Sequence, residues 1–348
     1  MAVASSRPDY AMDNMMRSYA NSGRGWTGGD GGESVALAGG RTAWLFDDSY
    51  LGKVVRGARP ESVFLHNMVV VQDQNSLTTR YRTWDRTPLE LMNRGIPLGS
   101  KRFYWSDDGI QADGSLWVTY SKYYYPGKPT VFGFVRLGEV LVRYSLRTMR
   151  TESVTRVPDA ARVIWGTWMT YHGPYVYIYG AETAKDGLST DVYLARAHLS
   201  DLVSPWQYWD GSEWSSDASL AAVISNSAGG QFSVTKVGNV YVLVTMGTGY
   251  LNRRVSVSFS CRPMGPFTNR KLAYTTTGRG GVYGTNGIPG LYTYGVTVHP
   301  ELSQGDQLVI SYDVNTSDWA LLNENVNIVR PRYARINIST SAAAALTT

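Results

Sequence analysis

Two aspartates, Asp30 and Asp48, stand in a stretch whose pattern predicts a β-hairpin. Apolar runs at Ser34–Leu37 and Thr42–Phe46 flank the Gly-bearing turn Ala38–Arg41. An antiparallel hairpin places the start of its first strand beside the end of its second, so we expect Asp30 and Asp48 to lie close together at one end. Two neighbouring carboxyl groups can carry out general acid/base chemistry on a sugar. Asp and Gly are also ordinary turn residues, so a purely structural role is the alternative.

A second acidic stretch follows an aromatic run. Asp107 and Asp108 come directly after Trp105-Ser106 in the segment RFYWSDDG at 102–109. An Asp-Gly turn is the favoured interpretation of this pair, and a place beside the first acidic pair is the alternative. Glu182 is a third acid, whose placement the sequence leaves open.

Tryptophans are numerous for a chain that otherwise resembles a β protein. Most of them should be buried, and Trp44, inside an apolar run, is expected in the core. Trp26 and Trp105 stand on predicted loops beside acids, where a flat apolar ring could stack on a sugar. With Tyr312, they are expected to line one exposed groove at the end of the fold that carries Asp30.

The composition favours an all-β fold. The 348 residues are 12% aromatic and include 36 Gly, and the apolar runs are short, β-branched and separated by turn residues. A unit of two aromatic-rich strands recurs at a spacing of about 50–65 residues, close to the length of a propeller blade. We therefore expect a single-domain five-bladed β-propeller, whose strands from about residue 330 complete a blade begun near the N-terminus. Two packed sheets are the alternative.

The expected boundaries follow from this pattern. Residues 1–24 are interpreted as a lead-in with a short amphipathic helix containing Met12, Met15, Met16 and Tyr19. Residues 25–338 are interpreted as the propeller and residues 339–348 as a flexible tail.

Charge and residue counts limit the partners and cofactors. The net charge of +5, with no run of Lys or Arg, makes no case for nucleic acid. The single cysteine, Cys261, excludes an internal disulfide, and the apolar alternation around it predicts a buried thiol. No His/Asp/Glu cluster has metal-ligand spacing, so we expect no cofactor; an axial calcium or sodium ion held by water and carbonyl groups would leave no sequence pattern. No segment has the apolar length of a membrane span or of a signal core.

Several motifs together resemble the domain-of-unknown-function family 4185. The resemblance begins with GWTGGDGGESVALAGGRTAWLFDDSYLG at 25–52 and extends to residue 338. Further segments match in order: HNMVVVQD at 66–73, RFYWSDDG at 102–109, YVYIYG at 175–180, VYLARA at 192–197, WQYWDGSEW at 206–214, GPF at 265–267, YGVTVHPELSQGDQLVISYDVN at 294–315 and VRPRYARINI at 329–338.

This resemblance implies a five-bladed propeller with glycosidase activity. The characterised members form glycoside hydrolase family 183, which are endo-D-arabinanases acting on α-D-arabinofuranosyl linkages of mycobacterial cell-wall arabinan. Matched by motif, Asp30 and Asp48 correspond to the family's acidic pair, and the other matched positions are polar or axial ones: Asn67, His299 and Tyr312. His299 ends a predicted strand, where a lone His more often has a structural role.

One position departs from the family pattern. Asp47 stands where the family usually has Gly, and an additional carboxylate there could raise the pKa of its neighbour or point away. The candidate substrate-binding residues on this interpretation are Trp26, Asp47, Asn67, Trp105, Asp108, His299 and Tyr312.

Two functions remain open at this stage: an endo-acting hydrolase of arabinan, and a non-catalytic glycan-binding propeller such as a phage-tail adhesin. A pure scaffold is a third. Because the chain shows no signal peptide, we expect an extracellular or virion-associated protein whose partners are an arabinan polysaccharide and other phage tail proteins.

Overall fold

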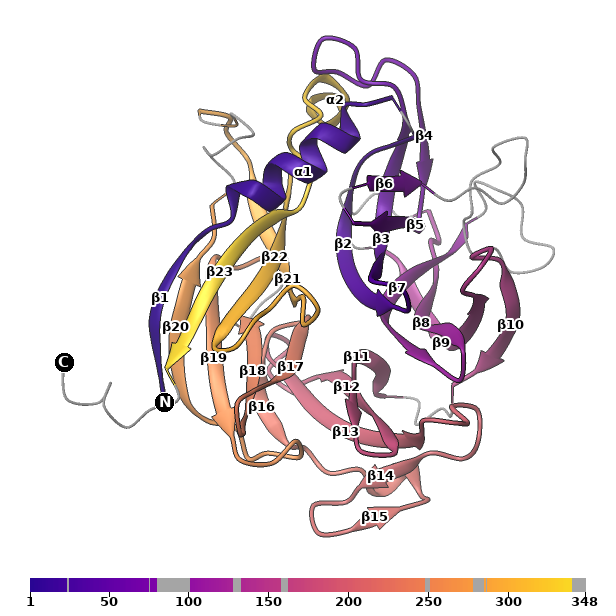
Figure 1. Ribbon diagram of the computed structural model, residues 1–348, viewed down its shortest axis with the longest axis vertical. Helices are drawn as coiled ribbons and strands as arrows, with labels where there is room; N and C mark the ends of the chain where they lie inside the picture. Colours follow the sequence, from indigo (N-terminus) through magenta and orange to yellow (C-terminus); the bar gives the residue numbers. More distant parts are fainter. Residues whose placement is uncertain are drawn as a thin grey trace.

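The protein is a five-bladed β-propeller in a computed structural model that describes residues 1–23, 25–74, 76–79, 101–127, 133–157, 162–247, 251–277, 285 and 287–339. Five separate antiparallel sheets are arranged around one axis (Figure 1). The all-β propeller predicted from the sequence is confirmed, and the alternative of two packed sheets is not. Of the expected tail, 339–348, the first residue ends β23 and residues 340–348 lie outside the described residues.

Each blade is a meander of consecutive strands. The first sheet contains β2 (Gly25–Leu37), β3 (Arg41–Gly52), β5 (Met68–Asp73) and β6 (Ser76–Thr79), with β4 (Ser62–Leu65) paired to β3. The second contains β7 (Arg102–Ala112), β8 (Ser115–Tyr124), β9 (Val135–Ser145) and β10 (Thr151–Arg156). The third contains β11 (Ile164–His172), β12 (Tyr175–Thr183), β13 (Thr190–His198), β14 (Gln207–Trp209) and β15 (Trp214–Ser215), with β16 (Ser225–Ala228) beside β13. The fourth contains β17 (Phe232–Val237), β18 (Val240–Met246), β19 (Arg254–Ser260) and β20 (Thr268–Thr275).

The fifth sheet joins the two ends of the described chain. It contains β21 (Tyr292–Val298), β22 (Gln307–Asn315) and β23 (Arg332–Ser339), and its outermost strand is β1 (Ala2–Pro8). The pairing of β1 with β23 is the predicted completion of a blade by strands from both ends of the sequence. It also means that the propeller includes residues from Ala2 onward, whereas the sequence pattern placed its start at residue 25.

The inner strand of each blade contacts the inner strands of its two neighbours. β2 lies against β7, β7 against β11, β11 against β17, β17 against β21, and β21 against β2. This closed ring brings residues from all five blades to the axis.

Apolar side chains fill the space between adjacent sheets. Trp44 is fully buried, as expected, and its indole N–H donates to Gln72 Oε1 at 2.9 Å. Cys261 is exposed, so the prediction of a buried thiol is wrong. The apolar alternation stops with β19 at Ser260, and Cys261 is the first residue of the following turn.

The helices of the described chain are short: α1 (Tyr10–Ala20), α2 (Trp319–Glu324) and the 3₁₀ turn η1 (Ala218–Leu220). None of them is long and apolar enough to cross a membrane. The predicted N-terminal helix corresponds to α1, which buries Met16 and Tyr19 against the first and fifth blades. Asp9 caps it by accepting from Met12 N at 3.3 Å and also forms an ion pair with Arg335 on β23 at 2.7 Å.

Met16→Ala should weaken the attachment of α1 to the first blade. Met16 is fully buried, and removing a large apolar side chain from a core costs about 2–5 kcal/mol of unfolding free energy. The measurement is chemical denaturation of the purified protein. Ser18→Ala, on the exposed side of the same helix, should change the unfolding free energy by less than about 0.5 kcal/mol. Equal effects of the two substitutions would contradict the packing described for α1.

Candidate active site

Asp30, Asp47 and Asp48 are brought together by an irregular stretch of the β2–β3 hairpin. Gly29 pairs with Ser49 and Gly31 pairs with Phe46, so Asp30 on one strand faces Asp47 and Asp48 on the other across a bulge. Both strands continue beyond this point, to Gly25 and Gly52, so the acids lie within the hairpin and not at its end.

The bulge depends on glycine. Gly31 and Gly32 have φ values of +76° and +87°, which side-chain-bearing residues rarely adopt. A Cβ at Gly31 would also lie 3.2 Å from the backbone nitrogen of Asp47. The Gly-rich run of the sequence therefore serves to let the two strands diverge and return around the carboxyl groups.

Asp48 is a partly exposed carboxyl group that accepts two hydrogen bonds. Its Oδ1 accepts from the indole N–H of Trp105 at 2.8 Å and from Nδ1 of His66 at 2.9 Å. A carboxylate can only accept, so His66 carries its proton on Nδ1 in this contact. Two donors on one oxygen suit a negatively charged Asp48.

Asp30 is in a different environment. Its Oδ2 is hydrogen-bonded to the hydroxyl of Tyr294 on β21, and its Oδ1 is buried without a hydrogen-bond partner among the described residues. Burial, followed by the charge of Asp48, raises the pKa of the Asp30 carboxyl to about 7. Near neutral pH a substantial fraction of the Asp30 carboxyl groups therefore holds a proton.

Further carboxyl groups surround this pair. Asp47 Oδ1 accepts from the backbone N–H and the hydroxyl of Ser106 at 2.7 and 2.9 Å, and Asp313 Oδ2 accepts from Gly31 N at 3.1 Å. Glu33 Oε2 is buried without a partner among the described residues. Burial raises the pKa of all three groups well above their usual range, and repulsion among the carboxyl groups adds to the effect.

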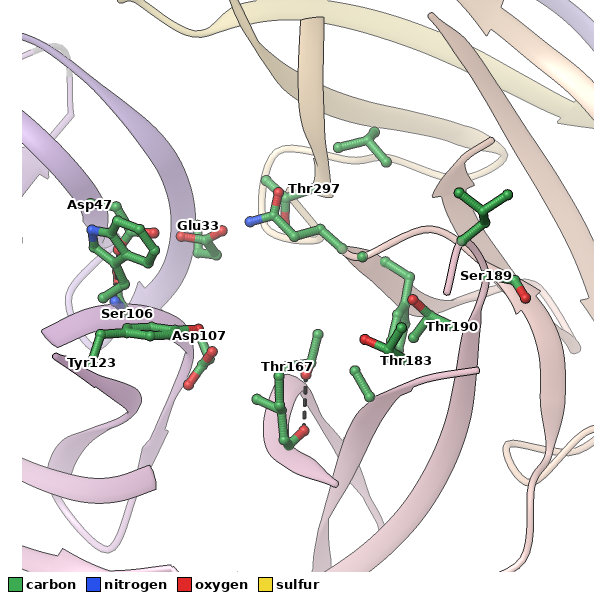
Figure 2. A pocket seen from close by; sticks show the side chains of 18 of the residues that line it. Glu33, Asp47, Ser106, Asp107, Tyr123, Thr167, Thr183, Ser189, Thr190 and Thr297 are labelled. Carbon is green, nitrogen blue, oxygen red and sulfur yellow. Dashed lines mark hydrogen bonds between the residues drawn. The ribbon is translucent and has the colours of Figure 1, made fainter. Parts of the chain in front are cut away.

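A cavity of ≈ 420 Å³ opens beside these acids on the propeller axis. Residues from all five inner strands line it, among them Glu33, Ser106, Thr167, Phe232 and Thr297. Figure 2 shows carboxyl groups on one side and hydroxyl groups of the third blade on the other. The carboxyl side consists of Glu33, Asp47 and Asp107, and the hydroxyl side includes Thr167, Thr183, Ser189 and Thr190.

Of the three aromatic residues predicted to line an exposed groove, only Trp105 lines the cavity. Trp26 is buried and stacks on Phe46 with ring centroids 4.4 Å apart. Tyr312 is buried, and its hydroxyl donates to Thr277 O at 3.1 Å. The groove was misplaced because an aromatic residue beside an acid in the sequence can face the space between blades, as Trp26 does.

Three polar candidates, Asn67, Asp108 and His299, make structural contacts and do not line the cavity. Asn67 is buried and donates to Tyr104 O at 3.0 Å. Asp108 is buried, and its two oxygens accept from Gly109 N at 2.7 Å and Met169 N at 2.6 Å, which ties the second blade to the third. It lies in a bulge of β7 and not in the favoured Asp-Gly turn, which occurs later at Asp113-Gly114.

His299 has the structural role that its position at a strand end suggested. It is fully buried between the rings of Trp44 and Tyr333, and its Nδ1 lies 2.6 Å from Ser34 Oγ. Burial lowers its pKa to about 3, so the ring stays neutral. Glu182, the acid of open placement, accepts from the Tyr193 hydroxyl at 2.6 Å in the third blade.

Sequence reasoning missed His66 and Tyr294, which contact Asp48 and Asp30 directly. His66 directly precedes Asn67, which was singled out, but nothing in the pattern shows which of the two faces the acids. Tyr294 is far from Asp30 in the chain and becomes its neighbour only because the ring closes. No group of three or more His, Cys, Asp or Glu in the described part of the chain is arranged to hold a metal ion.

A family model described as "Domain of unknown function (DUF5005)" matches residues 13–338. The chain belongs to the DUF5005 family. This is not the family that the sequence motifs resemble, and membership of family 4185 or of glycoside hydrolase family 183 is not shown. No curated protein sequence matches this DUF5005 protein significantly.

Solved structures share the fold of this DUF5005 protein. A protein from Bacteroides ovatus described as a "putative hydrolase" superimposes with a TM-score of 0.77 at 21% identity, over 95% of this chain and 90% of that one. A family 117 glycoside hydrolase from Zobellia galactanivorans gives a TM-score of 0.50 at 9% identity, over 93% and 87% of the two chains. An exo-β-1,3-galactanase from Phanerochaete chrysosporium also gives 0.50 at 9% identity, over 91% and 61%. At these identities the similarity shows the fold alone.

The buried acids should make the DUF5005 protein more stable at pH 5 than at pH 8. A carboxyl group whose pKa is raised by folding binds its proton more tightly when folded, so its contribution is lost as pH rises through the folded pKa. For Asp30 and Asp13 this stabilisation is lost as the pH rises from about 4, the pKa of the unfolded chain, to about 7, the pKa in the folded protein. The measurement is the melting temperature across this range.

Asp13→Asn is the matched test of this pH dependence. Asp13 is buried and accepts from Tyr333 N at 2.9 Å, a bond that the amide oxygen of Asn can also accept. The variant should show a smaller fall in melting temperature between pH 5 and pH 8 than the unmodified protein. A melting temperature that rises across this range would contradict the account of the acidic cluster.

Proposed function

We propose that this protein is a glycoside hydrolase in which Asp30 is the general acid and Asp48 the second catalytic carboxyl group. The observation that supports it most is the contrast between two carboxyl groups on facing strands. Asp30 is largely buried with a pKa near 7, while Asp48 is partly exposed and accepts two hydrogen bonds. Glycosidases use such a pair, one group protonated and the other ionised.

Asp30 would protonate the oxygen of the departing sugar. A group with a pKa near the working pH is still protonated in a useful fraction of molecules and can release its proton during the reaction. The Tyr294 hydroxyl on Oδ2 fixes the orientation of the carboxyl group.

Asp48 would act on the anomeric carbon, directly or through water. Trp105 and His66 hold its carboxylate in place with two charge-assisted hydrogen bonds. Trp105 also lines the axial cavity, which connects Asp48 to the space where a sugar would bind. Retention requires a carboxyl separation of about 5 Å and inversion about 6.5–9.5 Å, and proton NMR of the first product distinguishes the two outcomes.

The cavity supports a carbohydrate substrate. The hydroxyl groups of Thr183 and Thr190 lie across it from the carboxyl groups of Glu33 and Asp47 (Figure 2), and a hydroxyl group can both donate to and accept from a sugar hydroxyl. The hydroxyl groups of Thr167 and Ser189 already donate within the third blade and can accept. The fold is also that of proteins described as glycoside hydrolases.

The more specific proposal is endo-cleavage of D-arabinan outside the cell. It rests on the motifs that resemble family 4185, above all the Gly-rich segment around Asp30 and the segment around Asp47-Asp48. Mycobacterial arabinogalactan is therefore the first substrate to test, beside arabinoxylan and galactan. A virion-borne protein would meet this polymer at the cell surface, so an extracellular or phage-tail location is part of the same proposal.

Asp30→Asn and Asp48→Asn should each reduce glycan cleavage by about 10²–10⁴-fold, because an amide neither donates an acid proton nor carries a negative charge. The double variant should be little worse than either single one, because the two groups act in one step. The measurement is reducing-sugar release, with melting temperature to confirm folding. Asp73→Asn, an exposed acid at the end of β5 in the same blade, should keep full activity. Full activity in Asp30→Asn or Asp48→Asn would overturn the assignment.

The pH profile tests the role of Asp30 separately. If its protonated form is required, cleavage should fall as pH rises through about 7. Asp47→Asn should shift the pH at which cleavage falls and should affect the maximal rate less. Asp47 adds a carboxyl group near the catalytic pair but is neither of the two catalytic residues. A profile that stays flat from pH 6 to pH 9 would contradict Asp30 as the acid.

An unmodified protein that binds glycan without releasing reducing ends would instead identify a glycan-binding propeller. In that case the two Asn substitutions should change affinity, and no variant should affect turnover.

A further inference from the structure

A row of aromatic rings leads away from Asp48 across the surface of the first blade. We call the row Trp319, Phe64, His66 and Trp105 the aromatic strip. The Trp319 and Phe64 rings lie 6.1 Å apart, and the Phe64 and His66 rings 5.2 Å apart. His66 and Trp105 each donate a hydrogen bond to Asp48, so the strip meets the proposed catalytic carboxyl group at its inner end.

The outer end of the aromatic strip is exposed. Trp319 is 59% exposed and Phe64 is 36% exposed, although both are large apolar side chains. Inward along the strip, the His66 side chain is 28% exposed and the Asp48 side chain 29%. Solvent-accessible ring surface thus runs from Trp319 to the proposed catalytic carboxyl group.

Buried groups beneath the strip hold these rings in place. Phe103 stacks under His66 with ring centroids 4.2 Å apart, and Tyr50 packs edge-on against Phe64 at 5.3 Å. The guanidinium of Arg59 lies 4.7 Å from the centroid of the Tyr50 ring. An exposed ring on such a support loses little freedom when a ligand stacks on it.

Arg59 also fixes the position of Trp319. Its guanidinium donates to Leu322 O at 2.6 Å and to Val326 O at 3.0 Å, and its backbone N–H donates to Asn323 O at 2.8 Å. These carbonyl groups belong to α2 and the residues that follow it, so the short helix carrying Trp319 is attached to the loop before β4. The exposed tryptophan is therefore placed beside Phe64 by buried hydrogen bonds.

We propose that the aromatic strip binds a further part of the glycan chain, beyond the sugars at Asp30 and Asp48, so that the substrate is a polymer. This inference rests on the proposed function for its active site. Flat rings stack on the apolar faces of sugars, while the imidazole and carboxylate groups along the strip suit sugar hydroxyls. Phe64 and His66 separate Trp319 from Asp48. A sugar stacked on Trp319 is therefore not the one being cleaved, and only a chain of several sugars can occupy both places.

Trp319→Ala should lower kcat/KM for soluble mycobacterial arabinogalactan by about 5–100-fold, in line with the loss of one aromatic stacking platform. The same variant should cleave the shortest oligosaccharide that the unmodified protein accepts at an unchanged rate. Phe64→Ala should likewise lower the rate on the polymer and leave the rate on the short oligosaccharide unchanged. Trp319→Tyr, which keeps an aromatic ring, should retain most of the activity on the polymer. Tyr10→Ala, an exposed aromatic on α1, is the matched control and should change neither rate.

Glycan binding is measured independently by retardation in native gels that contain arabinogalactan. Trp319→Ala should lose the retardation that the unmodified protein shows. This result does not require hydrolytic activity, so the binding role of the aromatic strip and the proposed catalysis are tested separately. Equal losses on polymer and short substrate, retardation unchanged in Trp319→Ala, or no retardation of the unmodified protein would each overturn the strip as a binding site for this polymer.

Discussion

Carboxyl groups that repel one another are held together at the axis of this propeller. Asp30, Glu33, Asp47 and Asp313 come from two blades and are all removed from water to a large extent, and burial raises the pKa of each. They cannot all be ionised at once in such an environment. The arrangement persists because the ring of inner strands is closed and each blade is fixed by its neighbours. The rigid blades thus hold the carboxyl groups at fixed distances in spite of their mutual repulsion.

The different environments of Asp30 and Asp48 follow from where the blades meet. Asp30 faces the fifth blade, where Tyr294 contacts it and burial is deep. Asp48 faces the second blade, where Trp105 contacts it near the surface, and His66 of its own blade donates to the same oxygen. Two residues on adjacent strands therefore differ in burial and in hydrogen-bond partners because each one contacts a different neighbouring blade. Acid/base assignments in a propeller depend on the interfaces between blades as much as on the residues themselves.

The hairpin and the fold class could be predicted from sequence because their signals are local. Alternating apolar residues around Ala38-Gly39-Gly40 define β2 and β3, and repeated strand pairs indicate blades. The candidate site could be predicted only in part. Proximity of Asp30 to Asp48 follows from one hairpin, whereas the contact with Tyr294 depends on ring closure and has no local signal. Burial of Tyr312 was missed for the same reason, since its hydroxyl bonds to Thr277 in a distant segment. Trp26 stacks on Phe46 of its own hairpin, and the sequence pattern does not show which way its ring faces.

The pairing of β1 with β23 has a consequence for how the chain is made. β1 is synthesised first and its partner strand last, so the outer edge of the fifth sheet cannot form until nearly the whole described chain has been translated. Contacts of such long sequence separation form slowly, and an unpaired strand edge is open to association with other chains in the meantime. Until β23 emerges, β1 is a strand without a sheet. The outer edge of the fifth sheet is therefore the part of the propeller that the chain can complete only at the end of its synthesis.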